Sequence, residues 1–180
     1  VCAASKKIGV SAITVIGVLA LAGDDHGAKS STLPHQSDHI FKACMIPVLF
    51  PATVQEYLDM GLHGFAMSRY AGVWVGMKTV TEVVEASASV VVDPERVDIV
   101  LPSDFAMPAG GLNIRWPDSA LEMEARLLDY KLYAALAYCR ANRLNYTAID
   151  SPHARFGIVA SGKAYLDTRQ ALSDLGLDEQ

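Results

Sequence analysis

Apolar residues in the first half of the chain come in short runs that alternate with amphipathic stretches. Continuous apolar or β-branched runs occupy residues 15–22, 46–50 and 73–85. Such runs are typical of strands buried on both faces. Residues 37–45 and the segment after Thr53 have a helical pattern instead. The order strand, helix, strand, helix, strand predicts an α/β fold with a parallel sheet flanked by helices.

The second predicted helix has a clear start and two interruptions. Thr53 is followed three residues later by Glu56, which is the capping-box pattern, and the apolar spacing continues for about four turns. Gly61 and Gly64 interrupt it, and each costs about 1 kcal/mol relative to alanine in a helix. We therefore expect a close backbone approach at these glycines.

The second half of the chain has a different sequence pattern. Residues 86–116 contain short extended segments, prolines and glycines, and predict a connecting region. Ser119 and Glu122 form another capping box, and a helix of about 24 residues is expected to follow. Its predicted apolar face comprises Leu121, Ala125, Leu128, Leu132, Ala135, Leu136 and Cys139. Residues 156–180 read as a strand, a glycine turn and a helix that open a second α/β unit.

Composition narrows the class of protein. Apolar residues make up 51% of the 180 residues and charged residues 19%, as in a globular protein of one domain or one domain and part of another. The net charge is −5, and no Lys/Arg cluster interleaved with aromatics is present, so nucleic acid is not expected as a partner. Cys2, Cys44 and Cys139 fit no disulfide framework, zinc site or iron–sulfur ligand run. We expect Cys44 and Cys139 to be buried, reduced thiols in a reducing compartment.

The N-terminus has two interpretations. Lys6 and Lys7 precede an apolar run that ends in Ala-Leu-Ala, which resembles a secretory signal peptide. The run is shorter than the roughly 20 residues of a membrane-spanning helix, so no membrane span is expected. A buried strand at 15–22 is the favoured interpretation. Because the chain begins with Val1, we expect that its true start lies upstream.

A polar segment, GDDHGAKSSTLPHQSDHIF at residues 23–41, follows the first predicted strand directly. Ligands of parallel α/β sheets bind beyond the carboxyl ends of the strands. We therefore expect this segment to form part of a polar substrate or cofactor pocket, with a solvated loop as the alternative. A metal site held by His35 and His39 is a weaker alternative, because Pro34 places His35 in the first helical turn at best.

Two further sequence patterns are weaker indications of a functional site. Residues 157–164 match the G-x-x-x-x-G-K pattern of a phosphate-binding loop, but Ala164 replaces the Ser or Thr that binds Mg²⁺, and nucleotide binding is not expected. The helix N-terminus at 161–163 still suits an anion. Three residues flank the third predicted strand and are read mainly as boundary residues: Arg69, Tyr70 and Lys78.

Four stretches of the chain resemble a known family. They are AGDDHGAKSSTLPHQSDHIF, IPVLFPATVQEYLDMGLHGFAMSRYAGVWVGMKTVTEVVEASASV, GGLNIRWPD and GIVASGKAYLDTRQALSDLG. They are similar to the indolepyruvate:ferredoxin oxidoreductases in their long, fused bacterial form. These enzymes belong to the thiamine-diphosphate-dependent 2-oxoacid:ferredoxin oxidoreductases. The resemblance covers about residues 20–180, whereas residues 1–14 do not resemble the family and suggest a misread junction.

The resemblance implies a division of the chain and a reaction. Residues 1–89 would be part of a pyrimidine-binding domain, 90–150 its tail with the long helix, and 151–180 the start of a transketolase C-terminal-like domain. The implied reaction is oxidative decarboxylation of a 2-oxoacid, of the indolepyruvate or arylpyruvate type, to an acyl-coenzyme A. Electrons pass through iron–sulfur clusters to ferredoxin. The implied cofactors are thiamine diphosphate with Mg²⁺, at a site shared with absent segments, and iron–sulfur clusters elsewhere in the full-length enzyme.

The resemblance also implies site residues. The candidate cofactor- and substrate-binding residues are Asp24, Asp25, Gly27, Lys29, Ser30, Ser31 and His35. Lys29 is the favoured counter-charge for the substrate carboxylate, with His26, His35 and His39 as open alternatives. The expected catalytic glutamate lies upstream of this chain, the Gly-Asp-Gly motif for diphosphate and Mg²⁺ is absent, and no metal ligand is assigned.

The implied partners are the remainder of the same enzyme, ferredoxin, the 2-oxoacid and coenzyme A. The resemblance further implies a cytoplasmic protein that is a homo-oligomer at full length and inactive as this fragment. Two alternatives stay open. One is a non-catalytic α/β ligand-binding protein, exported if the N-terminus is a signal, and the other is a metal-dependent hydrolase that uses His35 and His39.

Overall fold

The structure, a computed structural model, describes residues 17–116 and 118–177. The N-terminal signal-like segment, Cys2 and the first two residues of the first predicted strand therefore lie outside the described residues. Within the described ranges, no helix combines the length and the apolarity that crossing a membrane requires.

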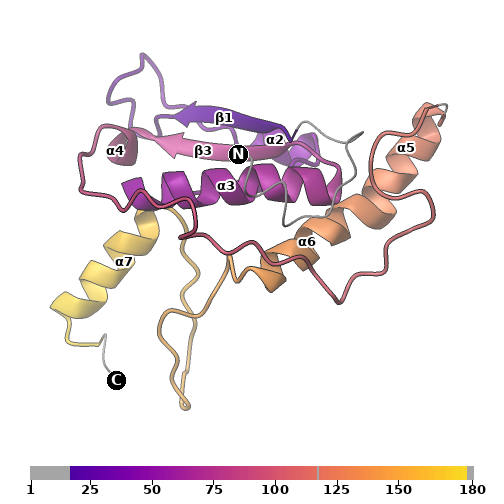
Figure 1. The fold of residues 1–180 in the computed structure, drawn as a ribbon. Helices are drawn as coiled ribbons and strands as arrows, with labels where there is room; N and C mark the ends of the chain where they lie inside the picture. The colour runs from indigo at the N-terminus through magenta and orange to yellow at the C-terminus, as the bar shows by residue number, and fades with distance from the viewer. Residues whose placement is uncertain (1–16, 117, 178–180) are drawn as a thin grey trace.

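Three parallel strands form the centre of the fold (Figure 1). They are β1 (Leu19–Asp24), β2 (Val48–Leu49) and β3 (Val75–Val80), arranged in the order β1-β3-β2. In the register of β1 and β3, Leu19 lies opposite Val75. The central strand β3 is the most buried of the three, which its continuous apolar sequence requires. The predicted parallel sheet is confirmed.

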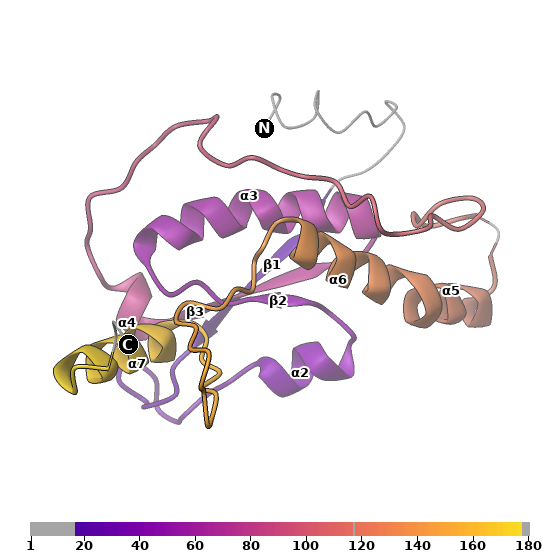
Figure 2. The same cartoon turned by 90° about the horizontal axis from the view of Figure 1, so that it is seen from below.

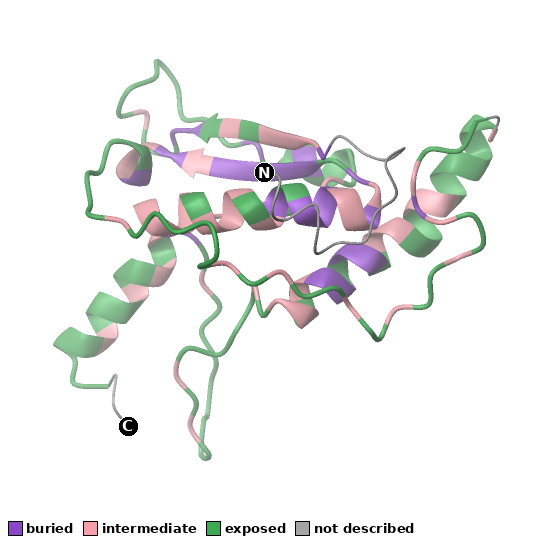
Figure 3. Ribbon diagram, viewed as in Figure 1, coloured by how far each residue is buried: buried purple, intermediate pink, exposed green. Residues whose placement is uncertain are grey.

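Helices cover both faces of this sheet, with α3 (Val54–Ala71) on one side and α2 (Asp38–Ala43) on the other (Figure 2). On the α2 side, a Cβ atom at Gly76 would lie only 3.0 Å from the Phe41 ring, so the glycine lets the helix approach the sheet. The main core lies between α3, β3 and the later helix α6 (Leu132–Ala141), as the burial colours show (Figure 3). It includes Met67, which is fully buried.

Helix α3 starts where the capping box predicts. The Thr53 hydroxyl accepts a hydrogen bond from the Glu56 N–H at 3.2 Å. Its two glycines differ. A Cβ atom at Gly64 would lie 2.6 Å from Leu19 Cδ1, which confirms the expected close approach. At Gly61 no described atom lies within 4 Å of that position, so the same expectation is wrong there.

The long helix consists of α5 (Ala120–Arg126), a π-helical turn η1 (Leu127–Lys131) and α6 (Leu132–Ala141). Its capping box is confirmed, because Ser119 and Glu122 bond each other's backbone N–H groups. The predicted apolar face is right only in part: Ala135 is buried and Cys139 packs against the core, but most of the predicted leucines do not. The buried residues are Ala134, Ala135, Ala137 and Tyr138, whereas Leu121 and Leu136 are exposed. The π-turn adds a residue to one turn and so rotates the face that follows it.

Several expectations about the chain's extended segments are wrong. The third strand does not continue to residue 85, because the chain turns after Val80 into the short helix α4 (Thr81–Val84). Residues 156–160 form no strand; no partner strand lies beside them in the described ranges, and an isolated strand cannot satisfy its backbone groups. Cys44 is exposed and Cys139 only half-buried, so the expectation of buried thiols is wrong for both.

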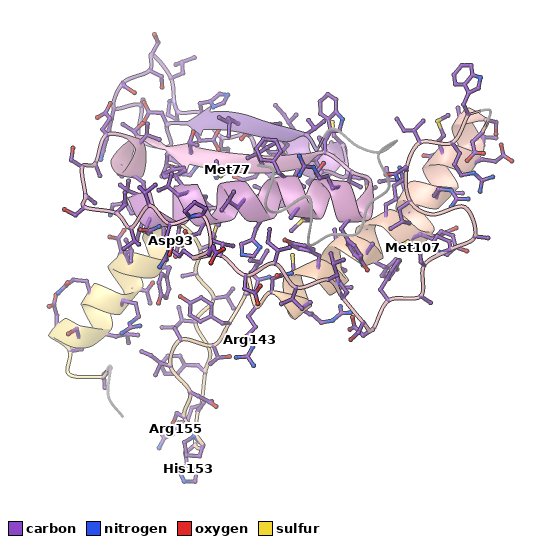
Figure 4. The ribbon with its side chains drawn as sticks, viewed as in Figure 1. Met77, Asp93, Met107, Arg143, His153 and Arg155 are labelled. Carbon is purple, nitrogen blue, oxygen red and sulfur yellow. The ribbon has the colours of Figure 1, made fainter. Side chains whose placement is uncertain are left out.

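The C-terminal helix α7 (Lys163–Asp174) lies to one side of the sheet and has no buried residue (Figures 1 and 3). The irregular segment before it extends away from the body of the protein, with His153 and Arg155 at its tip (Figure 4). The described chain is therefore an α/β fold with a small parallel sheet flanked by helices, with a loosely packed C-terminal element.

Candidate functional site

An open depression of about 390 Å³ lies at the carboxyl ends of β1 and β3. It is lined by Gly23, Asp24, Asp25, Ser30, Ser31, His35, Thr79, Thr81, Val84 and Glu85. The sequence places a pocket at this edge of the sheet, since ligands of parallel sheets bind beyond the strand carboxyl ends. Of the seven candidate residues, five line the depression, and Gly27 and Lys29 do not.

Asp25 organises the loop that follows β1. Its carboxylate accepts hydrogen bonds from the backbone N–H groups of Lys29 at 2.8 Å, Ser30 at 2.7 Å and Ser31 at 2.9 Å. These donors, with Ser30 and then Lys29 contributing most, hold the pKa of Asp25 well below its usual range. The left-handed residue of the loop is Ala28, with φ 49°, and not Gly27. Asp25 therefore has a structural role in this loop that its sequence context did not reveal.

Asp24, the last residue of β1, is a buried carboxylate beneath the depression. Its Oδ2 atom accepts hydrogen bonds from the Ser37 backbone N–H at 3.0 Å and the Ser37 hydroxyl at 3.1 Å. Burial alone raises the pKa of Asp24, but the hydrogen bonds from Ser37 and the charge of Lys78 outweigh it, so this pKa lies below its ordinary value. The carboxylate is thus ionised at neutral pH.

Lys78 supplies the buried counter-charge. Its ammonium lies 2.5 Å from Asp38 Oδ2, 3.4 Å from Asp24 Oδ2 and 4.7 Å from the centre of the Phe50 ring. From the sequence alone, Lys78 is expected to be one of three boundary residues. The missed signal is a charged residue within an apolar run, because a buried lysine requires a partner carboxylate.

The two imidazoles nearest Asp24 approach different oxygens. His35 Nδ1 lies 3.2 Å from Asp24 Oδ1, and His26 Nε2 lies 3.8 Å from Asp24 Oδ2. His39 is exposed on α2, which begins at Asp38. His35 and His39 therefore do not share a helix face, and the geometry expected for a metal pair is wrong.

One set of described side chains has the spacing of metal ligands. Ligand atoms of Asp24, His26 and Asp38 lie within 4.8 Å of one another. The Lys78 ammonium already contacts both carboxylates of this set. The cluster is therefore an ion-pair network around a buried lysine.

Lys29 lies outside the depression and connects the loop to α4. Its ammonium is 3.1 Å from Glu82 Oε1, in the first turn of that helix. A hydrogen bond from its own backbone N–H and the Lys29 ammonium lower the pKa of Glu82. The loop after β1 is thus fixed at one end by Asp25 and at the other by this ion pair.

The opposite wall of the depression was missed by sequence analysis. It consists of Thr79, Thr81, Val84 and Glu85, at the end of β3 and in the short helix α4 and its C-cap. The rule that located the first loop applies equally to β3, its neighbour in the sheet. The predicted third strand extended to residue 85, so residues 81–85 were assigned to the strand and not to the lining of a pocket.

The chemical character of the depression is that of a hydrogen-bond acceptor. The Thr79 hydroxyl donates to the Ala22 carbonyl at 2.9 Å, and the Ser31 hydroxyl contacts Asp25 Oδ2 at 3.0 Å. A hydroxyl that donates inward keeps its lone pairs for a ligand. With Glu85 also in the lining, the surface suits a ligand that carries N–H or O–H donors.

Comparison with known proteins adds a family relationship to this geometry. The sequence model for the indolepyruvate ferredoxin oxidoreductase middle domain matches residues 145–180. Two curated relatives are both called indolepyruvate oxidoreductase subunit IorA. The protein from Methanothermobacter marburgensis is 26% identical over 162 residues, and that from Methanothermobacter thermautotrophicus is 28% identical over 163 residues.

Each alignment covers 90% of this chain, which spans about a quarter, 26%, of the length of each relative. No solved structure matches the chain. The matches agree with the resemblance seen in the sequence: the chain is similar to indolepyruvate oxidoreductase subunits over most of its length, and residues 145–180 are similar to the middle domain of indolepyruvate ferredoxin oxidoreductases.

Proposed function

We propose that this chain is part of a 2-oxoacid:ferredoxin oxidoreductase and forms one wall of the site where the oxoacid and the cofactor meet. The observation that supports this most is the loop after β1, which Asp25 holds in shape at the carboxyl ends of two adjacent parallel strands. The depression beside it is open to solvent on one side. In a working enzyme, another segment would close it and exclude water.

The reaction that we propose for the whole enzyme is oxidation of an indolepyruvate-type oxoacid to an acyl-coenzyme A and CO₂, with electrons passed through iron–sulfur clusters to ferredoxin. The names of the two relatives support the oxidoreductase class and the oxoacid. When bound, thiamine diphosphate supplies the carbanion chemistry that decarboxylation needs. The role of this chain is to help bind and orient the substrate and the cofactor and to exclude water from them.

The depression fits the ring end of thiamine diphosphate better than its diphosphate. Outward lone pairs on Ser31 and Thr79 suit the amino group of the aminopyrimidine, which donates hydrogen bonds. The carboxylates of Asp25 and Glu85 line the same surface and repel a diphosphate. We therefore propose that the diphosphate, its Mg²⁺ and the iron–sulfur clusters are held by other segments of the enzyme.

Lys29 remains our proposed counter-charge for the substrate carboxylate, although it pairs with Glu82 in this structure. Its side chain is 59% exposed, so exchange of one carboxylate for another costs little. In the complete enzyme, Lys29→Ala should raise KM for the oxoacid about fivefold, which corresponds to roughly 1 kcal/mol of lost binding. Glu82→Gln, the matched variant, frees Lys29 and should not raise KM. An unchanged KM in Lys29→Ala would assign this lysine to loop stabilisation alone.

The proposed function is tested with the complete enzyme that contains this chain. Purified enzyme should reduce a viologen dye when it is given indolepyruvate or phenylpyruvate, thiamine diphosphate, Mg²⁺ and coenzyme A. Omission of either thiamine diphosphate or coenzyme A should abolish the reduction. The isolated 180-residue chain should show no turnover. Failure of the complete enzyme to oxidise any 2-oxoacid would refute the function, and turnover by the chain alone would refute the assignment to a single wall.

A further inference from the structure

One buried atom beneath the depression lacks a partner. The Asp24 side chain is fully buried, and its Oδ2 atom is bonded by Ser37 and faces Lys78. Its Oδ1 atom has no hydrogen bond within the described structure. A buried carboxylate oxygen without a donor is unfavourable, so the arrangement favours any donor that reaches it.

His35 is the group placed to be that donor. Its Nδ1 atom lies 3.2 Å from Asp24 Oδ1, within hydrogen-bond distance although not yet aligned for one. Mutual backbone hydrogen bonds with Asp25, of 3.0 and 3.2 Å, fix the main chain at His35. The main chain therefore already holds the imidazole beside the Asp24 carboxylate.

That contact determines the chemistry of the other ring nitrogen. When Nδ1–H donates to Asp24, the neutral imidazole carries its free lone pair on Nε2. His35 lines the depression, and its side chain is 55% exposed, so a ligand can reach Nε2. A buried carboxylate behind an exposed imidazole is the general arrangement of a base whose orientation is fixed by a second residue.

We propose that Asp24 and His35 form a carboxylate–imidazole pair that accepts a proton from the ligand in the depression. The proton leaves a hydroxyl group of the oxoacid-derived ligand and bonds to Nε2, and the ligand oxygen keeps the electron pair. The imidazolium that results faces the Asp24 carboxylate and later returns its proton to water. This inference rests on the proposed function for the identity of the ligand.

His26 does not have this arrangement, although it lies near the same carboxylate. Its Nε2 atom is 3.8 Å from Asp24 Oδ2, the oxygen that Ser37 and Lys78 already satisfy. His26 is also absent from the lining of the depression. It is therefore a matched control for His35, with the same side chain beside the same aspartate.

A first experiment measures the imidazole tautomers in the 180-residue chain by two-bond ¹H–¹⁵N correlation spectra at a pH where the rings are neutral. We expect Nδ1–H in His35, and Nε2–H in His26, whose Nε2 is the atom nearer the carboxylate. A predominant Nε2–H tautomer at His35 would overturn the proposed pair. This readout does not depend on the enzymatic activity.

A second experiment measures steady-state kinetics in the complete enzyme. His35→Gln keeps a hydrogen-bonding side chain but cannot carry the proton, and should lower kcat by roughly 10²- to 10⁴-fold with little change in KM. His26→Gln should retain the wild-type kcat. An unchanged kcat, or a change in KM alone, would overturn the role of His35. Absence of oxoacid oxidation in the wild-type enzyme would instead refute the proposed function, and the tautomer measurement would still decide whether the pair exists.

Discussion

The sheet region, residues 19–84, and the C-terminal region, residues 145–177, are held together in opposite ways. In the first, β3 and α3 contribute fully buried side chains, and the ionic groups of β1 and β3 are paired beneath the surface. In the second, α7 has no buried residue, and Val159 is 100% exposed. The family model matches the second region, whereas the two curated relatives align over 90% of the chain and so include the sheet region.

Few contacts hold the C-terminal region to the rest of the protein. Gly162 lies against the Phe50 ring, where a Cβ atom would come within 2.5 Å of the ring. The rings of Tyr146 and Tyr165 lie 6.3 Å apart within the region itself. A helix of 12 residues is marginally stable without tertiary packing. The comparison therefore predicts that equivalent substitutions have large effects in the sheet region and small ones in α7.

The largest contrast is expected between two lysines. Lys78→Met leaves the buried Asp24 without its counter-charge and should lower the free energy of unfolding by about 3 to 5 kcal/mol. Lys163 pairs with Asp167 on the surface of α7. Lys163→Met should therefore change the free energy of unfolding by less than about 0.5 kcal/mol. Urea unfolding followed by circular dichroism measures both. Equal losses in the two variants would contradict the contrast.

A similar contrast is expected for apolar side chains. Met67 of α3 is fully buried in the core, and Met67→Ala should cost about 2 to 5 kcal/mol through the cavity it creates. Leu166 in α7 is 39% exposed, and Leu166→Ala should cost less than about 1 kcal/mol. The same urea experiment applies, with an unchanged m-value as the check that both variants unfold in the same way. A cost at Leu166 as large as that at Met67 would show that α7 is packed after all.

The stability of the two regions should also differ in its dependence on pH. Because the folded-state pKa of Asp25 is depressed, its contribution to stability is complete above the ordinary aspartate pKa of about 4 and is lost as the pH falls below that value. Asp25→Asn should therefore destabilise the loop at pH 7 and make its stability less sensitive to pH between about 5 and 2. Hydrogen exchange at the N–H groups of Ser30 and Ser31 reports the change. Asp167→Asn in α7 should leave that exchange unaltered.

The smallest contrast is expected between two glycines. Gly64→Ala gains helix propensity but forces a Cβ atom to within 2.6 Å of Leu19 Cδ1, and a net loss of about 1 kcal/mol should result. Gly157 has no described atom within 4 Å of its Cβ position, so Gly157→Ala should have no measurable cost. Thermal unfolding midpoints measure both. A higher midpoint for Gly64→Ala would mean that Leu19 moves aside freely.

Those parts of the fold that depend on local sequence were predictable. The capping box at Ser119, the N-cap at Thr53, the helices that follow them and the parallel sheet are present as expected, but the Glu56 side chain bonds the Ala52 N–H instead of closing a capping box with Thr53. Residues 156–160 have the composition of a strand, but strand formation depends on a neighbour that the sequence of the segment does not contain. The end of β3 at Val80 was missed because β-branched residues continue beyond the point where the sheet ends.

The candidate site was predictable in position and less so in its internal contacts. The loop after β1 lies at the edge of the sheet where the topology places it. Its polar side chains, however, bond mostly to each other. Asp25 binds the loop backbone and Lys29 binds Glu82, and neither partner follows from spacing along the chain. Lys78 was undervalued because its partner carboxylates are 40 and 54 residues away in sequence.

The π-turn η1 gives the long helix two independently oriented halves. One additional residue rotates the side-chain positions by about 100° about the helix axis, so the faces of α5 and α6 are out of phase although their backbone is continuous. At the same turn, the Lys131 ammonium donates to the Gly72 carbonyl at 3.0 Å and so anchors the joint to the end of α3. Deletion of a single residue here would rotate α5 about the helix axis while α6 kept its contacts. A change of one codon would thereby redirect the surface that this arm of the protein presents.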